Sequence, residues 1–201
     1  MQTNEQQNIL PLAFLTLGIH YLIFIETVID ETVKQGNAHV LISNHHMTED
    51  ERHEKTRWSD INVMNPILFN LYHGLELIIK GLLFVHNKSV TPKHKLPDLH
   101  FQLSKIPNDQ FSTEAKSILS KYFNTVLLPN FLRNFLLTNE LKIDDLYAAL
   151  RYPADKNFKN IYSYFDLHYK GPEVTEFFKE LKKDMVSLRT AVVQHSRQYD
   201  I

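Results

Sequence analysis

Two residues near the end of the chain, Arg189 and His195, are of the types that can cleave RNA without a metal. A neutral imidazole can accept the proton of a ribose 2′-hydroxyl, and its cationic form can protonate the leaving oxygen. A guanidinium can stabilise the charge that develops on the phosphate. On one helix the two side chains point about 120° apart, so a symmetric dimer with two copies of each would complete such a site. The alternative is structural, with His195 closing an apolar seam and Arg189 beside it.

A second polar group interrupts the apolar segment 71–83. Glu76 and Lys80 are four residues apart and His73 precedes Glu76 by three, so the three side chains share one face of a helix. A helix that is apolar almost all round is expected to be buried, and buried charges need partners. We interpret Glu76 and Lys80 as a structural ion pair, and a supporting role at a functional site is the alternative.

Histidines and carboxylates also gather in the polar segment 44–59. The residues concerned are His45, His46, Glu49, Asp50, His53 and Glu54. Imidazole and carboxylate groups bind zinc or nickel, but this spacing matches no helical ligand motif. We therefore predict solvated side chains, no metal and no cofactor, and keep a metal-binding loop as the alternative.

The composition restricts the classes of partner but does not identify a particular one. The net charge of −1 provides no bulk attraction for nucleic acid, so an RNA contact would need a local basic patch. Basic residues concentrate in the middle of the chain, at Lys93, Lys95, Lys105, Lys116 and Lys121; a solvated helix face is the alternative there. The absence of cysteine excludes disulfides and cysteine nucleophiles, and is compatible with a cytoplasmic location.

Helical periodicity dominates the elements that must position these residues. Long helices are predicted over residues 11–35, 60–87 and 172–198, and shorter ones over 98–105, 112–126, 129–137 and 143–151. In the second and third long helices apolar residues recur at alternating spacings of four and three, which suits packing of one against the other. The sequence therefore predicts an all-α antiparallel bundle of about five to seven helices.

Two segments depart from this pattern. Residues 44–59 are predicted to form an exposed loop or insertion within a single domain covering residues 1–201. Residues 161–169 alternate between apolar and polar side chains, which predicts a short strand. Residues 39–43 are the segment with which that strand would form a minor β-hairpin.

The segment from Ile9 to Ile25 has no formally charged residue, so a membrane span and a signal peptide must both be considered. It is slightly short for a bilayer, and Pro11, Thr16, Gly18 and His20 dilute it. A signal peptide requires basic residues before its apolar run, and no lysine or arginine precedes this segment. We therefore predict a buried or half-buried helix of a cytoplasmic protein that does not contact a membrane.

Three of these features together resemble the HEPN family of compact α-helical domains. They are the apolar helix with Glu76 and Lys80, the following segment 94–99, and Arg189 and His195 with five residues between them. The likeness covers about residues 60–198. Many members carry an Arg-x4–6-His motif on a late helix and act as dimeric ribonucleases in toxin–antitoxin, abortive-infection or CRISPR systems. Thr190 departs from the family, where Asn, Asp or His often follows the arginine.

The resemblance implies a metal-independent endoribonuclease of a toxin or phage-defence system that acts as a homodimer on RNA. In that hypothesis His195 is the general acid and base, Arg189 stabilises the phosphate, and Glu76, Lys80, His73 and Thr190 support the site. The alternative hypothesis is a non-catalytic HEPN-like module. It would bind RNA or a protein partner, such as a nucleotidyltransferase-like antitoxin.

Overall fold

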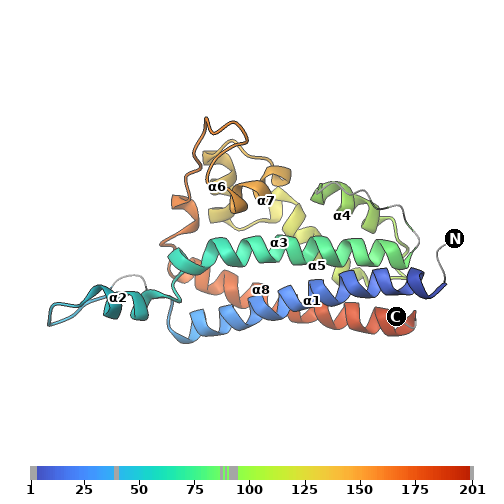
Figure 1. The fold of residues 1–201 in the computed structure, drawn as a ribbon, viewed down its shortest axis with the longest axis horizontal. Helices are drawn as coiled ribbons and strands as arrows, with labels where there is room; N and C mark the ends of the chain where they lie inside the picture. Colours follow the sequence, from blue (N-terminus) through green and yellow to red (C-terminus); the bar gives the residue numbers. More distant parts are fainter. Residues whose placement is uncertain (1–3, 39–40, 87, 89, 91–94, 200–201) are drawn as a thin grey trace.

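The computed structural model describes residues 4–38, 41–86, 88, 90 and 95–199 (Figure 1). Within those residues there are eight α-helices, two short 3-10 helices and no β-strand. The prediction of an all-α bundle is therefore confirmed.

Most of the predicted helices are present. They are α1 (Asn4–Lys34), α2 (Glu49–Thr56), α3 (Asp60–Val85), α4 (Leu96–Ser104), α5 (Thr113–Phe123), α6 (Asn130–Thr138), α7 (Ile143–Arg151) and α8 (Pro172–Gln198), with 3-10 helices η1 (Thr125–Leu127) and η2 (Phe165–Leu167). The bounds of α7 and α8 match the predicted ranges at both ends, and α3 begins at the predicted residue. The first helix begins ahead of Pro11, where a start was predicted, and contains that proline.

Three long helices form the framework of the bundle (Figure 1). Helix α1 runs antiparallel to α3, since Phe14 contacts Phe84 near one end and Tyr21 contacts His73 further along. It also runs antiparallel to α8. Asp30 of α1 pairs with Lys182 near the start of α8, whereas Glu26, which comes earlier in α1, pairs with Arg189, which comes later in α8. Helices α3 and α8 therefore point in the same direction.

The most extensive helix pair is α1 with α3, and not α3 with α8 as the two seams predicted. Glycines explain the difference, because they let two backbones approach closely. A Cβ atom added to Gly18 would lie 2.7 Å from Ile78 Cγ1 and 3.1 Å from the Gly74 carbonyl oxygen. At Gly81 it would lie 2.6 Å from Leu15 Cδ2.

Helix α3 is the buried centre of the molecule, as the segment 71–83 predicted. Leu71, Leu75, Ile78 and Leu82 are all fully buried. Helix α1 covers one side of α3, while α4 and α7 pack on another side. Because α3 is enclosed from several directions, its apolar character all round is accounted for by burial within the protein.

The polar segment 44–59 differs from the predicted loop, because it contains helix α2. Thr48 and Glu51 form a capping box in which the Thr48 hydroxyl accepts the Glu51 amide and the Glu51 carboxylate accepts the Thr48 amide. None of the residues of α2 is buried. The helix projects from one end of the bundle (Figure 1), which is consistent with the predicted exposure of the segment.

The predicted strand over residues 161–169 is wrong. Its apolar residues do not share one face, since Leu167 is fully buried whereas Ile161 and Phe165 are exposed. Ile161 makes only an isolated bridge with Ala154, and the chain then turns through η2. Residues 39 and 40 of the proposed partner segment lie outside the described residues.

A buried carboxylate connects three distant parts of the chain. Asp60 is the first residue of α3, follows the capping residue Ser59 and is fully buried. Its carboxylate accepts the backbone N–H groups of Tyr169 and Lys170, each at 3.1 Å. The side chain of Asn37 donates to the same carboxylate and accepts the Asp60 amide. Asp60 therefore joins the end of α1, the start of α3 and the approach to α8.

Two helices are long and apolar enough to cross a membrane by length and composition alone. One is α3, whose qualifying window is 72% buried, and the other is the segment Ile9–Lys34, whose window is 33% buried. Burial explains the apolar character of α3. Much of the apolar surface of α1, in contrast, faces outward.

Candidate functional site

His195 lies in the last turns of α8, against the end of α3. Its side chain is buried, and its Nε2 atom is 3.2 Å from Nε2 of His86, the residue that caps α3. The rings of Phe111 and Tyr199 pack on the same imidazole, with centroids 5.2 and 4.8 Å away. A hydrogen bond between two imidazole nitrogens needs one donor and one acceptor, so this contact cannot hold two cationic rings.

The surroundings favour the neutral form of both histidines. Burial and then the neighbouring His86 lower the pKa of His195 to about 4. Burial also lowers the pKa of His86, with a further contribution from Lys88 and Lys116. At neutral pH His195 is therefore in its neutral form, and the cationic form that a general acid requires is scarcely populated.

A polar pocket of about 200 Å³ opens beside His195. It lies between the connection of α4 to α5 and the last turns of α8. Its polar lining comprises Asn108, Asp109, Gln110, Ser112, Gln194 and Gln198. Amide and hydroxyl groups of this kind can form hydrogen bonds with a small polar ligand.

Arg189 is directed toward a different helix. Its Nε and Nη2 atoms donate to Oε1 and Oε2 of Glu26 on α1, at 3.2 and 3.1 Å. The guanidinium therefore forms a two-pronged ion pair with one carboxylate, which is the strong geometry for this type of contact. Thr190, the residue that follows, donates its hydroxyl to the Val186 carbonyl of its own helix.

The two predicted catalytic residues are thus apart within one chain. Arg189 is held against α1, whereas His195 faces α3 and the loop that contains Phe111. This matches the different directions expected for them on one helix. The contribution of a second chain stays a prediction.

Glu76 and Lys80 form an ion pair inside the molecule. Lys80 Nζ lies 2.6 Å from Glu76 Oε1, and the two side chains are only 9% and 2% exposed. One turn earlier, Nδ1 of His73 lies 3.2 Å from the Tyr147 hydroxyl, and its ring meets Tyr21 edge-on. The ion pair lies within α3, whereas His73 connects α3 with α7 and α1.

Three lysines of the middle region contact other groups of the protein, and Lys95 is exposed; Lys105 lies over the ring of Phe101. Lys121 binds Asp184 at 2.8 Å, and Lys116 donates to the Ile106 carbonyl. Lys93 lies outside the described residues, as does His94 of the family-like segment. Among the described residues, Lys116 and Lys121 thus have partners within the protein, and a basic patch in this region stays a prediction.

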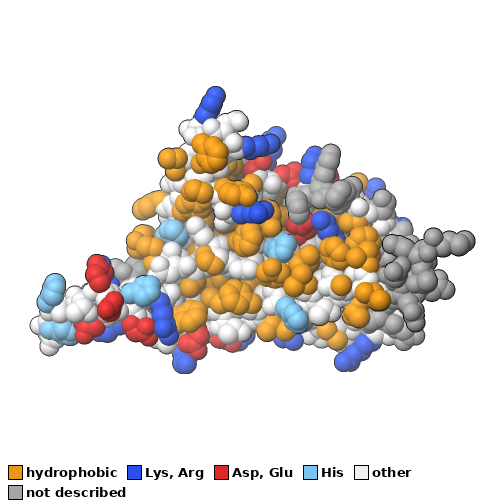
Figure 2. All heavy atoms as spheres, in the orientation of Figure 1, with side chains coloured by type: hydrophobic (Ala, Val, Ile, Leu, Met, Phe, Trp, Pro, Cys, Tyr) orange, Lys and Arg blue, Asp and Glu red, His pale blue; other side chains and the backbone are white. Residues whose placement is uncertain are grey.

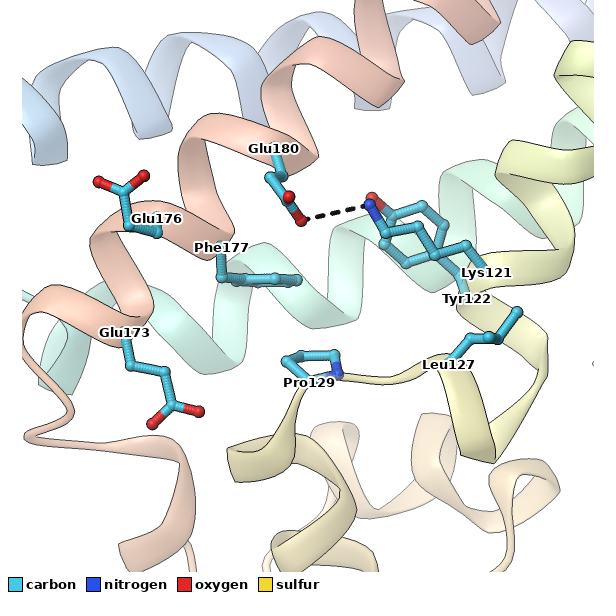
Figure 3. A pocket seen from close by; sticks show the side chains of 8 residues that line it. All are labelled: Lys121, Tyr122, Leu127, Pro129, Glu173, Glu176, Phe177 and Glu180. Atoms are coloured by element: carbon cyan, nitrogen blue, oxygen red, sulfur yellow. Dashed lines mark hydrogen bonds and ion pairs between the residues drawn. The ribbon is translucent and has the colours of Figure 1, made fainter.

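A pocket of about 260 Å³ separates η1 from α8 (Figure 3). It is lined by Lys121, Tyr122, Leu127, Pro129, Glu173, Glu176, Phe177 and Glu180. Glu180 points toward Lys121 across the pocket, 3.4 Å away, and Glu176 pairs with Lys179 at 2.6 Å. Two of its three glutamates thus already have lysine partners, which weakens its attraction for a cation.

The histidines of the polar segment do not form a metal site with their neighbours. Among the described residues, no group of three or more histidine, aspartate or glutamate side chains converges with metal-binding geometry. His45 instead contacts the Ser43 hydroxyl at 3.0 Å. The sequence interpretation missed His86, although it ends the apolar seam of α3 in the way that His195 ends the seam of α8.

Comparison of the chain with protein-family models, with curated proteins and with solved structures finds no match.

The pair His86–His195 is expected to make stability depend on pH. The folded-state pKa of His195, about 4, lies below its ordinary value of 6.5. The stabilisation is therefore complete above pH 6.5 and is lost as the pH falls toward 4, by up to about 3 kcal/mol. Urea unfolding at pH 7.5 and pH 4.5 measures this change in the free energy of unfolding.

The variant His195→Leu isolates this contribution from those of His100 and His168, whose pKa values burial also lowers. Its stability should fall less than that of the wild type between the two pH values. The exposed residue His45 provides the matched control, and His45→Leu should follow the wild type. An equal fall in all three proteins would contradict the assignment.

Proposed function

We propose that the chain is a non-catalytic HEPN-like module that assembles with a second copy of itself through the outer face of α1. The observation that carries the proposal is an exposed apolar face on a helix whose other side is well packed. Its exposed large side chains are Ile9, Leu10, Leu12, Leu17, Ile23 and Phe24. Hydrophobic side chains gather over this part of the molecule (Figure 2). Contiguous patches of large exposed apolar side chains mark interaction sites on globular proteins.

The spacing of the face supports a second copy as the partner. Leu10, Leu17 and Phe24 follow one another at intervals of seven, so they lie almost on one line along α1. In an antiparallel pair centred on Leu17, Leu10 of each copy meets Phe24 of the other. Such an arrangement is self-complementary, as a two-fold interface requires.

The contacts of Arg189 and His195 support a non-catalytic role. The Arg189 guanidinium has a carboxylate partner in Glu26, and His195 is buried and neutral beside His86. A nuclease of the predicted type needs a guanidinium directed at the phosphate and an imidazole that gains and loses a proton. To meet these two requirements, Arg189 and His195 would have to leave their present partners, and α8 would have to shift against its neighbours.

The assembly is tested by Leu17→Glu, which places a charge at the centre of the face. We expect the wild type to be a dimer by light scattering, and the variant to dissociate at least about 100-fold more readily because the charge would be buried without a partner. The control is Phe101→Glu on α4, because Phe101 is also an exposed apolar residue but does not belong to α1. A monomeric wild type at about 100 μM, or a dimeric Leu17→Glu variant, would reject the proposal.

One observation favours the metal-independent endoribonuclease as the second candidate. His86 and His195 face one another beside a polar pocket, and two imidazoles can divide the tasks of base and acid between them. RNA incubated with the protein and EDTA tests this candidate. It requires cleavage by the wild type and a loss of at least about 100-fold in His195→Ala and His86→Ala. Equal cleavage by all three proteins would exclude these residues, and cleavage that EDTA abolishes would instead indicate a metal.

A further inference from the structure

The connection between α7 and η2 forms a tight loop whose conformation is set by one carboxylate. Asp155 accepts the backbone N–H groups of Asn157 and Lys159 at 3.1 and 2.9 Å. It also accepts the side-chain amide of Asn160 at 2.9 Å. With the bridge from Ala154 to Ile161, these bonds give residues 154–161 a defined shape.

The same loop is attached firmly to the rest of the protein. The side chain of Asn139, at the end of α6, both accepts the Ser163 amide at 2.7 Å and donates to its carbonyl at 2.9 Å. The Tyr164 hydroxyl donates to the Ala149 carbonyl of α7. Hydrogen bonds therefore set the path of the loop backbone both within the loop and where it joins α6 and α7.

Phe158 occupies the loop in a conformation that a phenylalanine rarely adopts. Its φ angle is +56° and its side chain is 85% exposed. A left-handed backbone costs a bulky residue about 1–2 kcal/mol, and exposure of the ring brings no compensating burial. Neither the backbone conformation nor packing favours an aromatic residue at this position, and contact with a ligand would account for it.

The charges around Phe158 indicate the chemistry of that ligand. Lys156 and Lys159 flank Phe158 in the sequence and are exposed, and Arg151 lies over the exposed ring of Tyr152 at 5.1 Å. The one acidic residue of the segment 151–162 is Asp155, whose oxygens are engaged by the loop itself. The segment is thus basic in a chain whose net charge is −1.

A pocket of about 550 Å³ adjoins the loop. It is lined by two carboxylates as well as by the ammonium group of Lys159, and the lining residues are Thr138, Asn139, Glu140, Leu141, Asp155, Lys159, Asn160, Ile161 and Tyr162. The side chain of Asn139 is engaged by Ser163, so the side-chain carbonyl of Asn160 is the group that can bond to the edge of a planar heterocycle, while the ammonium group of Lys159 can meet a phosphate. The volume lies in the range of small-ligand sites.

We propose that this loop and the adjoining pocket bind single-stranded nucleic acid, with Phe158 stacking on a base and Lys156 and Lys159 contacting phosphates. Exposed aromatic rings between basic side chains are the usual platform for such strands, because every base has a face on which to stack. The site lies on a different element from the outer face of α1 and does not depend on self-association.

Fluorescence anisotropy of the full chain with labelled 12-mers of oligouridine and oligothymidine tests the proposal. The thymidine strand has no 2′-hydroxyl, so it also reports binding if RNA is cleaved, and the two strands separate RNA from DNA preference. Phe158→Ala is expected to weaken binding about 10-fold. Phe101→Ala is the matched control, because Phe101 is also exposed with a lysine, Lys105, over its ring; it should bind like the wild type.

Replacing Lys156 and Lys159 together by Gln should reduce the slope of log affinity against log salt concentration by about 1.4. Thermal melting of each variant verifies that it remains folded. The proposal is overturned if neither strand binds, or if Phe158→Ala and Phe101→Ala bind equally. Binding of both variants to phosphatidylserine vesicles is measured as well. If Phe158→Ala loses vesicle binding but keeps strand binding, the loop is a membrane contact and the proposal is overturned.

Discussion

Replacing Asp60 by alanine is expected to lower the free energy of unfolding by about 3–4 kcal/mol. The carboxylate accepts the backbone N–H groups of Tyr169 and Lys170 and the side chain of Asn37. Alanine would leave these donors facing a cavity. The carboxylate also lies at the start of α3 and just before α8, where a negative charge is stabilised by two helix dipoles.

Urea unfolding at neutral pH measures the effect. Asp60→Asn keeps the shape and one good acceptor but loses the charge, so its cost should be about half that of alanine. Asp30→Ala removes an exposed carboxylate paired with Lys182, and should change the free energy of unfolding by less than about 1 kcal/mol. If Asp60→Ala were as stable as Asp30→Ala, the connecting role of Asp60 would be refuted.

The variant Gly18→Val is expected to lower the free energy of unfolding by about 3 kcal/mol. A Cβ atom at this position would lie 3.1 Å from the Gly74 carbonyl oxygen and 3.2 Å from the Ile78 amide nitrogen. Both are backbone atoms of a packed helix, which cannot turn aside as a side chain can. The modest helix-forming gain from replacing glycine, below about 1 kcal/mol, does not offset this crowding.

The midpoint of urea unfolding again provides the measurement. Ala13→Val is the matched control, because Ala13 is on the same helix but exposed. That variant should unfold within about 0.5 kcal/mol of the wild type. Equal destabilisation by the two substitutions would mean that the close approach of α1 and α3 does not limit residue size at Gly18.

Local patterns predicted most of the helices because the relevant information is local. Gly171 and Pro172 mark the start of α8, and the residues before Pro153 end α7, so both bounds could be predicted from turn and proline chemistry. The burial of α3 followed from its apolar residues on every side. The alternation over residues 161–169 led to a wrong prediction of a strand. Of the apolar residues at its odd-numbered positions only Leu167 is fully buried, and a local pattern does not reveal which residues are buried.

Contacts between distant residues could not be predicted in the same way. Asp60 meets Lys170 across 110 positions, and nothing in the periodicity of either segment indicates that pairing. The close approach of α1 and α3 at Gly18, Gly74 and Gly81 was likewise not predicted, because no local pattern identifies the helix that each glycine meets. For the candidate site, the spacing identified Arg189 and His195 but not Glu26 and His86, their partners, since each lies on another helix.

The arrangement of α1 also has a consequence for synthesis of the chain. The outward face is rich in large apolar residues, and the inward face depends on Gly18 meeting Gly74, which is translated 56 residues later. At ribosomal rates of about 5–20 residues per second, this interval is roughly 3–11 s. During that time the uncharged segment from Ile9 to Ile25 is without its packing partner α3, so chaperones and membrane-targeting factors have time to compete for it.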